Sequence, residues 1–166
     1  MGQLMIRQIE ERDIASCLEI YNYEVLNGVA TLDVEPRTLA EWGQWYEAHR
    51  NVHHPIIVGS VDDAVVGYAS LSPYRMKEAY KSTVELSIYI HPDYRGQGIA
   101  TKLMAHVLDM AKADITLHNV VSVITAGNEG SRILHERFGF TYCGRLPEVG
   151  FKHGTYQDTE TYTLLV

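Results

Sequence analysis

The sequence predicts an α/β (α+β) fold, in which helices pack against a sheet. Segments with the apolar patterns of strands outnumber segments with helical spacing, and both kinds occur along the whole chain. The 166 residues suffice for one domain with a proper core, and no repeat, low-complexity tract or linker divides them. We therefore expect a single domain that spans residues 1–166.

The first half of the chain predicts three strands and two helices. Residues 4–9, "LMIRQI", have the composition of a strand. Asp13 is expected to cap a helix whose apolar residues recur at helical spacing, namely Ile14, Cys17, Leu18, Tyr21 and Val25. Thr38 is expected to open a second helix with one apolar side formed by Leu39, Trp42 and Trp45 or Tyr46. Residues 55–71 then predict a hairpin that turns at Asp62 and Asp63.

The second half predicts four strands and two helices. The strands are expected at "TVELSIYI" (83–90), "VVSVIT" (120–125), "TYCGRL" (141–146) and "TETYTLLV" (159–166). A long helix is indicated by an apolar stripe at Ile99, Leu103, Val107 and Met110. A shorter helix is expected from about Glu129 to Phe138, with its end at Gly139.

Composition and charge exclude several classes of protein. Apolar residues make up 46% and charged residues 21%, as in globular proteins rather than disordered or membrane-spanning ones. The net charge of −7 argues against a general nucleic-acid binder. Cys17 and Cys143 show no metal or redox spacing, which favours free thiols in a reducing compartment. The N-terminus has no secretory pattern, so a cytoplasmic location without membrane or nucleic-acid partners is expected.

The segment "RGQGIA", residues 95–100, places a glycine-rich bend at the start of a helix. Glycine lets backbone N–H groups turn toward a ligand, and the first helical turn leaves N–H groups unpaired at the positive end of the dipole. A pyrophosphate satisfies both, and Arg95 adds a positive charge. The alternative is a tight strand-to-helix connection without a ligand. The segment lacks the third glycine of a dinucleotide fingerprint and the Gly-Lys-Ser/Thr of a P-loop.

Arg95-x-x-Gly98-x-Ala100 resembles the acyl-CoA pyrophosphate motif of the GNAT acetyltransferase superfamily, and residues 128–140, "NEGSRILHERFGF", resemble its next motif. The resemblance implies acetyl-CoA as co-substrate and a GNAT-type fold, with a mixed central sheet of about seven strands flanked by about four helices. It implies that the diphosphate is bound by Arg95, Gly96, Gln97, Gly98, Ile99, Ala100 and Thr101. It also implies that the pantetheine arm is bound by Asn128 and the backbone of Ile88, Tyr89 and Ile90. The alternative for Asn128 is a helix cap.

Three further segments extend the resemblance over nearly the whole chain, namely "EIYNYEVLNGVATLD", "YRMKEAYKSTVELSIYIHPDYRGQGI" and "VGFKHGTYQD". They resemble the phosphinothricin and methionine sulfone/sulfoximine N-acetyltransferase subfamily. The resemblance implies an enzyme that transfers the acetyl group of acetyl-CoA to the α-amine of a small L-amino acid or analogue, by direct attack in a ternary complex. Enzymes of this subfamily are usually dimers, so a homodimer is expected.

Glu85 is the candidate general base, in contact with the acceptor amine. Side chains alternate along "TVELSIYI", so Glu85, Ser87 and Tyr89 face away from the apolar residues of the strand. A carboxylate in so apolar a strand is costly unless it is partnered or functional, and partial burial raises its pKa toward neutrality. The resemblance also implies a glutamate with this role. The alternatives are a solvated face of the strand or an ion pair with a nearby arginine.

His135 occupies the position at which many GNAT enzymes carry a tyrosine proposed to protonate the CoA thiolate, and histidine here is typical of the phosphinothricin-type subfamily. An imidazole can donate a proton to the leaving sulfur or take one from the amine. The alternative is a surface or capping histidine. The other histidines, including the pair His53 and His54, show no ligand spacing, so no metal is expected.

The acceptor is expected to meet Arg75, which suits a bidentate contact with an α-carboxylate. The subfamily often has a second arginine where this chain has Lys77, a point charge rather than a fork. Tyr74, Tyr80 and Tyr156 are candidate walls of the acceptor pocket, the alternative being ordinary half-buried tyrosines. Tyr156 replaces the tryptophan usual in the subfamily, and this difference bears on specificity.

Two other functions remain open. One is acetylation of a protein N-terminus or another amine, which an acidic pocket rim would favour, whereas Arg75 and Lys77 favour an anionic acceptor. The other is a non-catalytic CoA-binding module, which would follow if Glu85 and His135 did not converge on the thioester.

Overall fold

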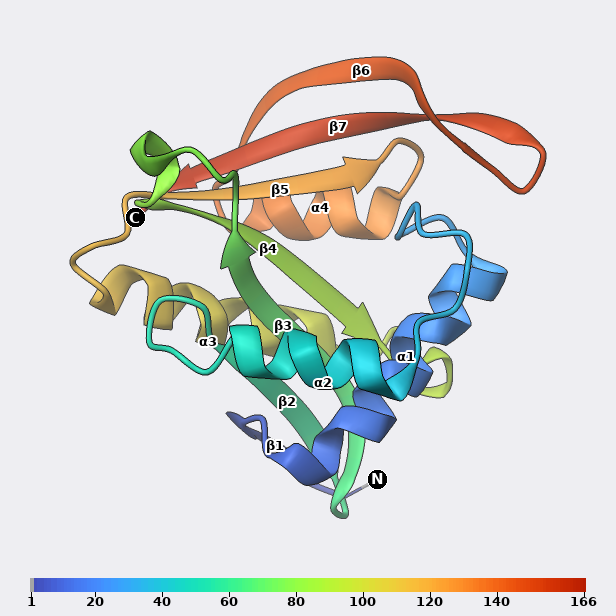
Figure 1. Cartoon of the computed structure of the whole chain (residues 1–166), viewed down its shortest axis with the longest axis vertical. Coiled ribbons are helices and arrows are strands. Elements are labelled where there is room, and N and C mark those ends of the chain that lie inside the picture. Colours follow the sequence, from blue (N-terminus) through green and yellow to red (C-terminus); the bar gives the residue numbers. More distant parts are fainter. Residues whose placement is uncertain (1) are drawn as a thin grey trace.

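In residues 2–166, which the computed structural model describes, one mixed sheet is flanked by helices (Figure 1). Its seven strands are ordered β1-β2-β3-β4-β5-β7-β6. The strands are β1 (Leu4–Gln8), β2 (Ile56–Val61), β3 (Ala64–Pro73), β4 (Thr83–Ile90), β5 (Asn119–Thr125), β6 (Thr141–Lys152) and β7 (Thr155–Leu165). The helices are α1 (Ile14–Asn27), α2 (Leu39–Ala48), α3 (Ile99–Ala113) and α4 (Glu129–Arg137), with short 3₁₀ turns η1 (Glu11–Asp13), η2 (Glu78–Tyr80) and η3 (Pro92–Tyr94). The predicted sheet of about seven strands with about four helices is confirmed.

The junction between β4 and β5 interrupts the regular pairing of the sheet. The other neighbouring strands pair antiparallel, whereas β4 and β5 run parallel. They pair over only three residues each, Thr83–Glu85 with Asn119–Val121. Beyond these residues the two strands diverge, as Figure 1 shows. The divergence leaves one edge of β4 without a strand partner, so its backbone groups need another partner or solvent.

The two faces of the sheet carry separate cores. On one face α3 buries Leu103 and Val107 in a cluster that includes Val84 of β4. On the other face, in front in Figure 1, α1 and α2 pack Trp42 against Tyr68 of β3. The alternation predicted for β4 is confirmed, because its even-numbered side chains join the first cluster while Tyr89 packs against the second.

Of the two predicted helix caps, Thr38 is confirmed and Asp13 is not. Thr38 caps α2 in a capping box, in which its hydroxyl accepts from the Glu41 N–H and the Glu41 carboxylate accepts from the Thr38 N–H. The prediction that Asp13 caps α1 was wrong. Its carboxylate accepts instead from the Arg7 guanidinium, at 2.6 and 2.9 Å, and from the Glu10 N–H at 2.8 Å. Asp13 therefore ties β1 to the turn before α1.

The C-terminal hairpin is longer than its sequence predicts. β6 extends to Lys152 and β7 already begins at Thr155, so the hairpin includes residues that lie outside the two predicted strands, 141–146 and 159–166. The pairing shifts between Leu146 and Gly150, and Glu148 has a positive φ of 50°. A bulge of this kind absorbs the irregular segment without ending the strand.

Candidate active site

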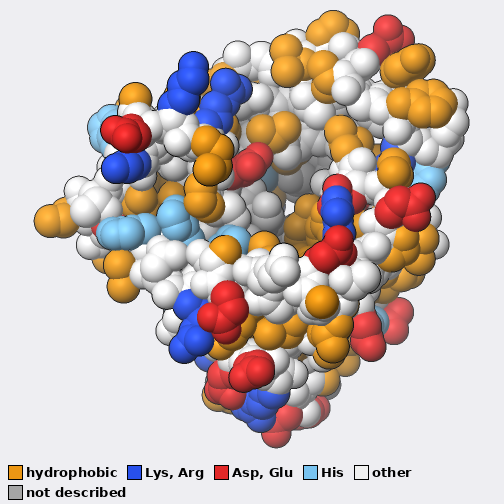
Figure 2. All heavy atoms as spheres, viewed as in Figure 1, with side chains coloured by type: hydrophobic (Ala, Val, Ile, Leu, Met, Phe, Trp, Pro, Cys, Tyr) orange, Lys and Arg blue, Asp and Glu red, His pale blue; other side chains and the backbone are white. Residues whose placement is uncertain are grey.

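A cleft of about 730 Å³ occupies the space where β4 and β5 diverge. Figure 2 shows this face of the molecule hollowed in its middle. The cleft brings together most of the predicted coenzyme-binding residues and one candidate catalytic residue, namely Ile88, Tyr89, Ile90, Arg95, Gly96, Gly98, Ile99, Ala100, Thr101, Asn128 and His135. Residues that are distant in sequence therefore share one space, as a binding site for an extended ligand requires.

The backbone of β4 forms one wall of this cleft. The His91 N–H donates to the Val66 carbonyl at 2.8 Å, which continues the antiparallel ladder with β3. Bonded and non-bonded pairs alternate along such a ladder, so Ile88 and Ile90 turn their N–H and C=O groups away from β3 and toward the cleft. The backbone of Tyr89 is directed to β3 instead. Of the three residues implied to bind the pantetheine arm, Ile88 and Ile90 thus present their backbone groups to the cleft, and Tyr89 does not.

The start of α3 forms the floor at one end of the cleft. Gly96 and Gly98 have φ of 74° and 79°, a conformation that favours glycine. The first helical bond runs from the Lys102 N–H to the Gly98 carbonyl. The N–H groups of residues 99–101 consequently have no intrahelical acceptor, and these residues line the cleft at the positive end of the helix dipole. The arrangement suits a phosphate-bearing ligand.

Two other residues of the bend take different roles. The Arg95 guanidinium pairs with the buried carboxylate of Glu24 at 2.9 Å and also donates to the Ile90 carbonyl at 3.3 Å. Its charge is therefore held beside the cleft by the protein itself. Gln97 is exposed and is not among the lining residues, and its amide donates to the Asp93 carbonyl.

Asn128 caps α4, because its side chain accepts from the Ser131 N–H at 3.1 Å. This contact supports the capping alternative for Asn128 and places the residue on the cleft wall as well.

His135 is 5% exposed, and its ring lines the cleft. Its Nδ1 lies 2.7 Å from the Ser131 carbonyl, so we assign the proton to Nδ1 and a lone pair to Nε2. Among the described residues, the buried Nε2 has no hydrogen-bond partner. Burial lowers the pKa of His135 below its ordinary value, although the hydrogen bond to Ser131 opposes the shift. Near pH 7 the ring is neutral and offers a proton acceptor to the cleft.

Ser122 of β5 is a cleft residue that sequence reasoning missed. It is 1% exposed, and its hydroxyl has no partner among the described residues. Burying a polar atom without a partner costs roughly 1–3 kcal/mol, so a ligand or water is expected to complete it. The signal in the sequence is a serine inside the apolar run "VVSVIT".

Glu85 is not among the residues that line the cleft; it is the last residue of β4 that pairs with β5, and the lining begins at the next residue, Leu86. Its side chain lies on the face covered by α1 and α2, across the ladder from Ser72. The residue is half-buried, and burial raises the pKa of its carboxyl group above the ordinary value. A raised pKa is what a carboxylate needs in order to accept a proton near neutrality.

Comparison with known proteins agrees with this geometry. A family model described as the Acetyltransferase (GNAT) family matches residues 17–140, well over half of the chain. The chain belongs to the GNAT acetyltransferase family. An L-methionine sulfoximine/L-methionine sulfone acetyltransferase of Pseudomonas paraeruginosa is 37% identical to it over 154 residues, 92% of this chain and 89% of the relative.

Two solved GNAT-type structures superpose closely on this chain. A phosphinothricin acetyltransferase from Sinorhizobium meliloti, crystallised with AcCoA, has a TM-score of 0.94 and 32% identity, and the match covers 98% of this chain and 88% of that one. A ribosomal-protein-alanine N-acetyltransferase from Brucella melitensis has a TM-score of 0.94 and 34% identity, with 98% and 99% covered. The predicted family and fold are confirmed.

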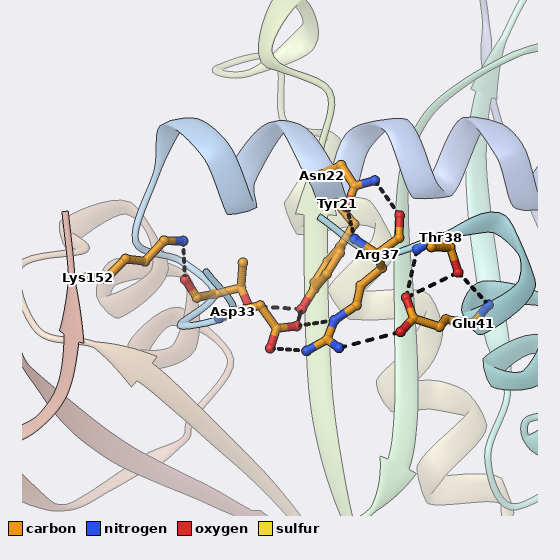
Figure 3. Close-up of polar contacts among 8 residues, drawn as sticks. Tyr21, Asn22, Asp33, Arg37, Thr38, Glu41 and Lys152 are labelled. Carbon is orange, nitrogen blue, oxygen red and sulfur yellow. Dashed lines mark hydrogen bonds and ion pairs between the residues drawn. The ribbon is translucent and has the colours of Figure 1, made fainter. Parts of the chain in front are cut away.

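In this GNAT protein the loop between α1 and α2, residues 28–38, is held by distant elements. The Thr125 hydroxyl donates to the Val29 carbonyl at 2.6 Å. Lys152, 2% exposed, reaches from the end of β6 and donates to the Thr31 carbonyl at 2.8 Å, a contact drawn in Figure 3. Burial lowers the pKa of Lys152, while the charges of Glu24 and Asp33 oppose this shift. The first residues of this loop, 28–30, line the cleft, and the loop thus depends on β5 and the C-terminal hairpin for its position.

The predicted acceptor residues lie outside the cleft lining. Arg75 and Lys77 are exposed, and the Arg75 guanidinium lies over the rings of Tyr74 at 5.0 Å and Tyr80 at 5.8 Å. Tyr156 is 61% exposed on the β6–β7 hairpin. These side chains occupy the segment before β4 and the hairpin, two separate parts of the surface, and their contact with an acceptor remains a prediction.

Within residues 2–166, no group of three or more histidine, cysteine, aspartate or glutamate side chains is arranged to hold a metal ion. None of the helices described there is both long and apolar enough to span a bilayer.

Proposed function

We propose that this protein transfers the acetyl group of acetyl-CoA to the α-amine of a small L-amino acid or analogue. The observation that carries the proposal is the cleft, which is lined by the edge of β4, the start of α3 and two residues with unpartnered buried atoms, Ser122 and His135. Such a set suits a long ligand that bears amides, a diphosphate and a thioester. The named activities of the relatives support the same function.

Acetyl-CoA fits the groups that line the cleft. The N–H groups of residues 99–101 would bind the diphosphate, and the backbone of Ile88 and Ile90 would pair with the pantetheine amides like an added strand. The bound coenzyme supplies a thioester carbonyl. A backbone N–H of the β4 edge would then hydrogen-bond the carbonyl oxygen and stabilise negative charge that develops on it.

The two candidate catalytic groups approach the gap from opposite faces of the sheet. Glu85 shares its face with α1 and α2, whereas His135 packs at 4.8 Å from the Phe140 ring in the core on the α3 side. An amine that arrives on the Glu85 side would leave room for the sulfur on the His135 side. Glu85 would accept the amine proton, directly or through water. After attack, the nitrogen would release its second proton to Nε2 of the neutral His135. The imidazolium, a stronger acid than free imidazole because burial disfavours its charge, would pass this proton to the sulfur as the C–S bond breaks.

Replacing His135 by glutamine is expected to lower kcat by roughly 10- to 100-fold, because an amide of similar size can neither take nor give a proton. The KM for acetyl-CoA should change little, since the other cleft contacts remain. Steady-state kinetics at saturating acceptor measures this. His106→Gln, an exposed position on α3, is the matched control. An unchanged kcat in His135→Gln would remove His135 from the chemistry.

A second candidate function is acetylation of a protein N-terminus, which the similarity to the ribosomal-protein-alanine N-acetyltransferase from Brucella melitensis favours. The two functions differ in the group attached to the α-carbon of the acceptor, which is a free carboxylate in one case and a peptide in the other. A panel assay separates them: thiol release from acetyl-CoA with L-methionine sulfone, L-phosphinothricin, L-alanine and an Ala-initiated peptide. We expect the free amino acid analogues to react faster than the peptide. Preference for the peptide would establish the second function, and CoA binding without any turnover would indicate a binding module.

We also propose a cytoplasmic homodimer without membrane or nucleic-acid partners. The free cysteines and the net charge of −7 support the compartment and the absence of nucleic acid. The dimer is supported by large apolar side chains on the β6–β7 hairpin that are more than half exposed, among them Leu146, Val149, Phe151 and Tyr156.

A further inference from the structure

Ser122 and His135 each bury a polar atom that has no hydrogen-bond partner among the described residues, namely the Ser122 hydroxyl oxygen and Nε2 of His135. Ser122 is 1% exposed and His135 is 5% exposed, and both residues line the cleft. Buried polar atoms in proteins are nearly always paired. Two unpaired ones at the same cleft therefore point to a ligand group that completes both.

Both side chains lie on the face of the sheet that packs against α3. Side chains alternate along β5, and Val120 and Ile124, two residues before and after Ser122, belong to the core on that face. Tyr162 of β7 is directly opposite Ser122 and belongs to the same core. The centroid of its ring lies 5.7 Å from that of the His135 ring. Ser122 and His135 thus share Tyr162 as a neighbour.

Ser122 stands at the narrow end of the cleft. The pairing of β4 with β5 ends at Glu85, and the lining begins beyond it, with Leu86 on β4 and Ser122 on β5. The bend before α3 lies at the other end of this stretch of β4, where Arg95 donates to the Ile90 carbonyl. Four residues of extended strand span about 13 Å. A coenzyme with its diphosphate at the start of α3 and its pantetheine arm along β4 would therefore bring its sulfur toward Ser122.

Hydroxyl groups near Ser122 are bonded elsewhere. Tyr162 donates to the Glu160 carboxylate at 3.2 Å. The Thr125 hydroxyl, on β5 itself, donates to the Val29 carbonyl at 2.6 Å. The Ser122 hydroxyl, by contrast, keeps its proton available for a ligand.

A thiol matches the two unpaired atoms. A sulfhydryl group donates one weak hydrogen bond and accepts another, so the thiol of CoA can donate to Nε2 of His135 and accept from the Ser122 hydroxyl. The sulfur of the acetyl thioester has no proton and carries less negative charge than a thiolate, so its contacts with the same atoms are weaker. An interaction that strengthens between the substrate complex and the transition state raises kcat.

We propose that Ser122 is a further catalytic residue, whose hydroxyl hydrogen-bonds the coenzyme sulfur while the C–S bond breaks. This inference rests on the proposed function and adds a second group at its leaving sulfur. Once the acceptor nitrogen has bonded to the carbonyl carbon, the C–S bond breaks and its electron pair passes to the sulfur. Ser122 keeps its own proton and stabilises the negative charge, and the His135 imidazolium supplies the proton that completes the thiol.

Calorimetry with two ligands tests this contact without turnover. Desulfo-CoA, in which hydrogen replaces the thiol group, keeps every other group of CoA. The wild type is expected to bind CoA more tightly than desulfo-CoA, and Ser122→Ala should reduce the ratio of the two affinities about threefold to tenfold, the contribution of one hydrogen bond. Ser60→Ala should leave the ratio unchanged, because Ser60 is also buried on a strand but lies on β2, outside the cleft lining.

Kinetics and thermal melting distinguish a catalytic serine from a structural one. Ser122→Ala should lower kcat about tenfold with the KM for acetyl-CoA nearly unchanged, because the contact strengthens as charge develops on the sulfur. Without ligand, the variant should melt at or above the temperature of the wild type, since it removes a hydroxyl that has no partner among the described residues. A lower melting temperature with an unchanged affinity ratio would show a structural serine and overturn the proposal.

The outcomes separate this inference from the proposed function. An affinity ratio that Ser122→Ala leaves unchanged would refute the contact with the sulfur, while the N-acetyltransferase would stand. A wild type that binds neither CoA nor desulfo-CoA would refute both.

Discussion

Replacing Glu85 by glutamine is expected to lower kcat/KM for the amine by about two to three orders of magnitude, the usual contribution of a general base. Glutamine keeps the size and hydrogen-bonding capacity of the side chain but cannot accept the ammonium proton. Because Glu85 is half-buried and makes no ion pair among the described residues, the fold should tolerate the change. Stopped-flow or steady-state thiol release measures the rate, and calorimetry should show that CoA still binds.

The pH dependence of the reaction rate tests the role of Glu85 as general base independently. Burial raises the pKa of Glu85 above its ordinary value, so the active carboxylate is lost as pH falls through this raised pKa and the wild-type rate falls with it. Glu85→Gln should lack that acidic limb. Glu19→Gln, at an exposed position of α1, should retain both the limb and the rate. A mutant rate close to wild type, with the limb unchanged, would exclude Glu85 as the base.

Replacing Ala100 by glutamate is expected to weaken acetyl-CoA binding about 10- to 100-fold more than replacing it by glutamine. Ala100 is the second residue of α3 and lines the cleft, so either side chain enters the space assigned to the diphosphate. The two variants differ only in charge. Two like unit charges about 4 Å apart repel by about 1 kcal/mol in water and about 4 kcal/mol at the lower effective dielectric near a protein surface. Titration calorimetry with CoA measures the difference.

The thermal stability of the two Ala100 variants serves as the control for this comparison of affinities. An acidic residue in the first turn of a helix is favourable, so Ala100→Glu should melt at or above the temperature of Ala100→Gln. Lower affinity in a more stable variant would locate the negative charge of the ligand at this helix start. Equal affinities in the two variants would place the diphosphate elsewhere.

Much of the fold follows from local patterns in the sequence. Alternation in "TVELSIYI" identified β4 and the face on which Glu85 lies, and the glycine bend with the apolar stripe after it identified the start of α3. These features depend on residues close together in the chain. The predicted coenzyme residues therefore meet in the cleft, with the exception of Gln97.

Other features depend on contacts between distant residues and could not be predicted. Arg95 pairs with Glu24, 71 residues away, so a cation predicted to serve the ligand has an internal partner. A cavity of about 300 Å³ combines residues from α1, α2, the loop between them, β3 and β4 and has no motif of its own. Asp13 was mistaken for a helix cap because its partner, Arg7, lies on β1.

The short pairing of β4 with β5 also has a mechanical consequence. Strands β1–β4 and strands β5–β7 form two subsheets whose direct backbone seam is three residue pairs long. A coenzyme bound between the two subsheets would contact both and stabilise their junction, which has few backbone pairs of its own. Amide hydrogens that flank this junction would accordingly be among the first in the sheet to exchange with solvent in the apoprotein. They would also be among those most protected when the coenzyme is bound.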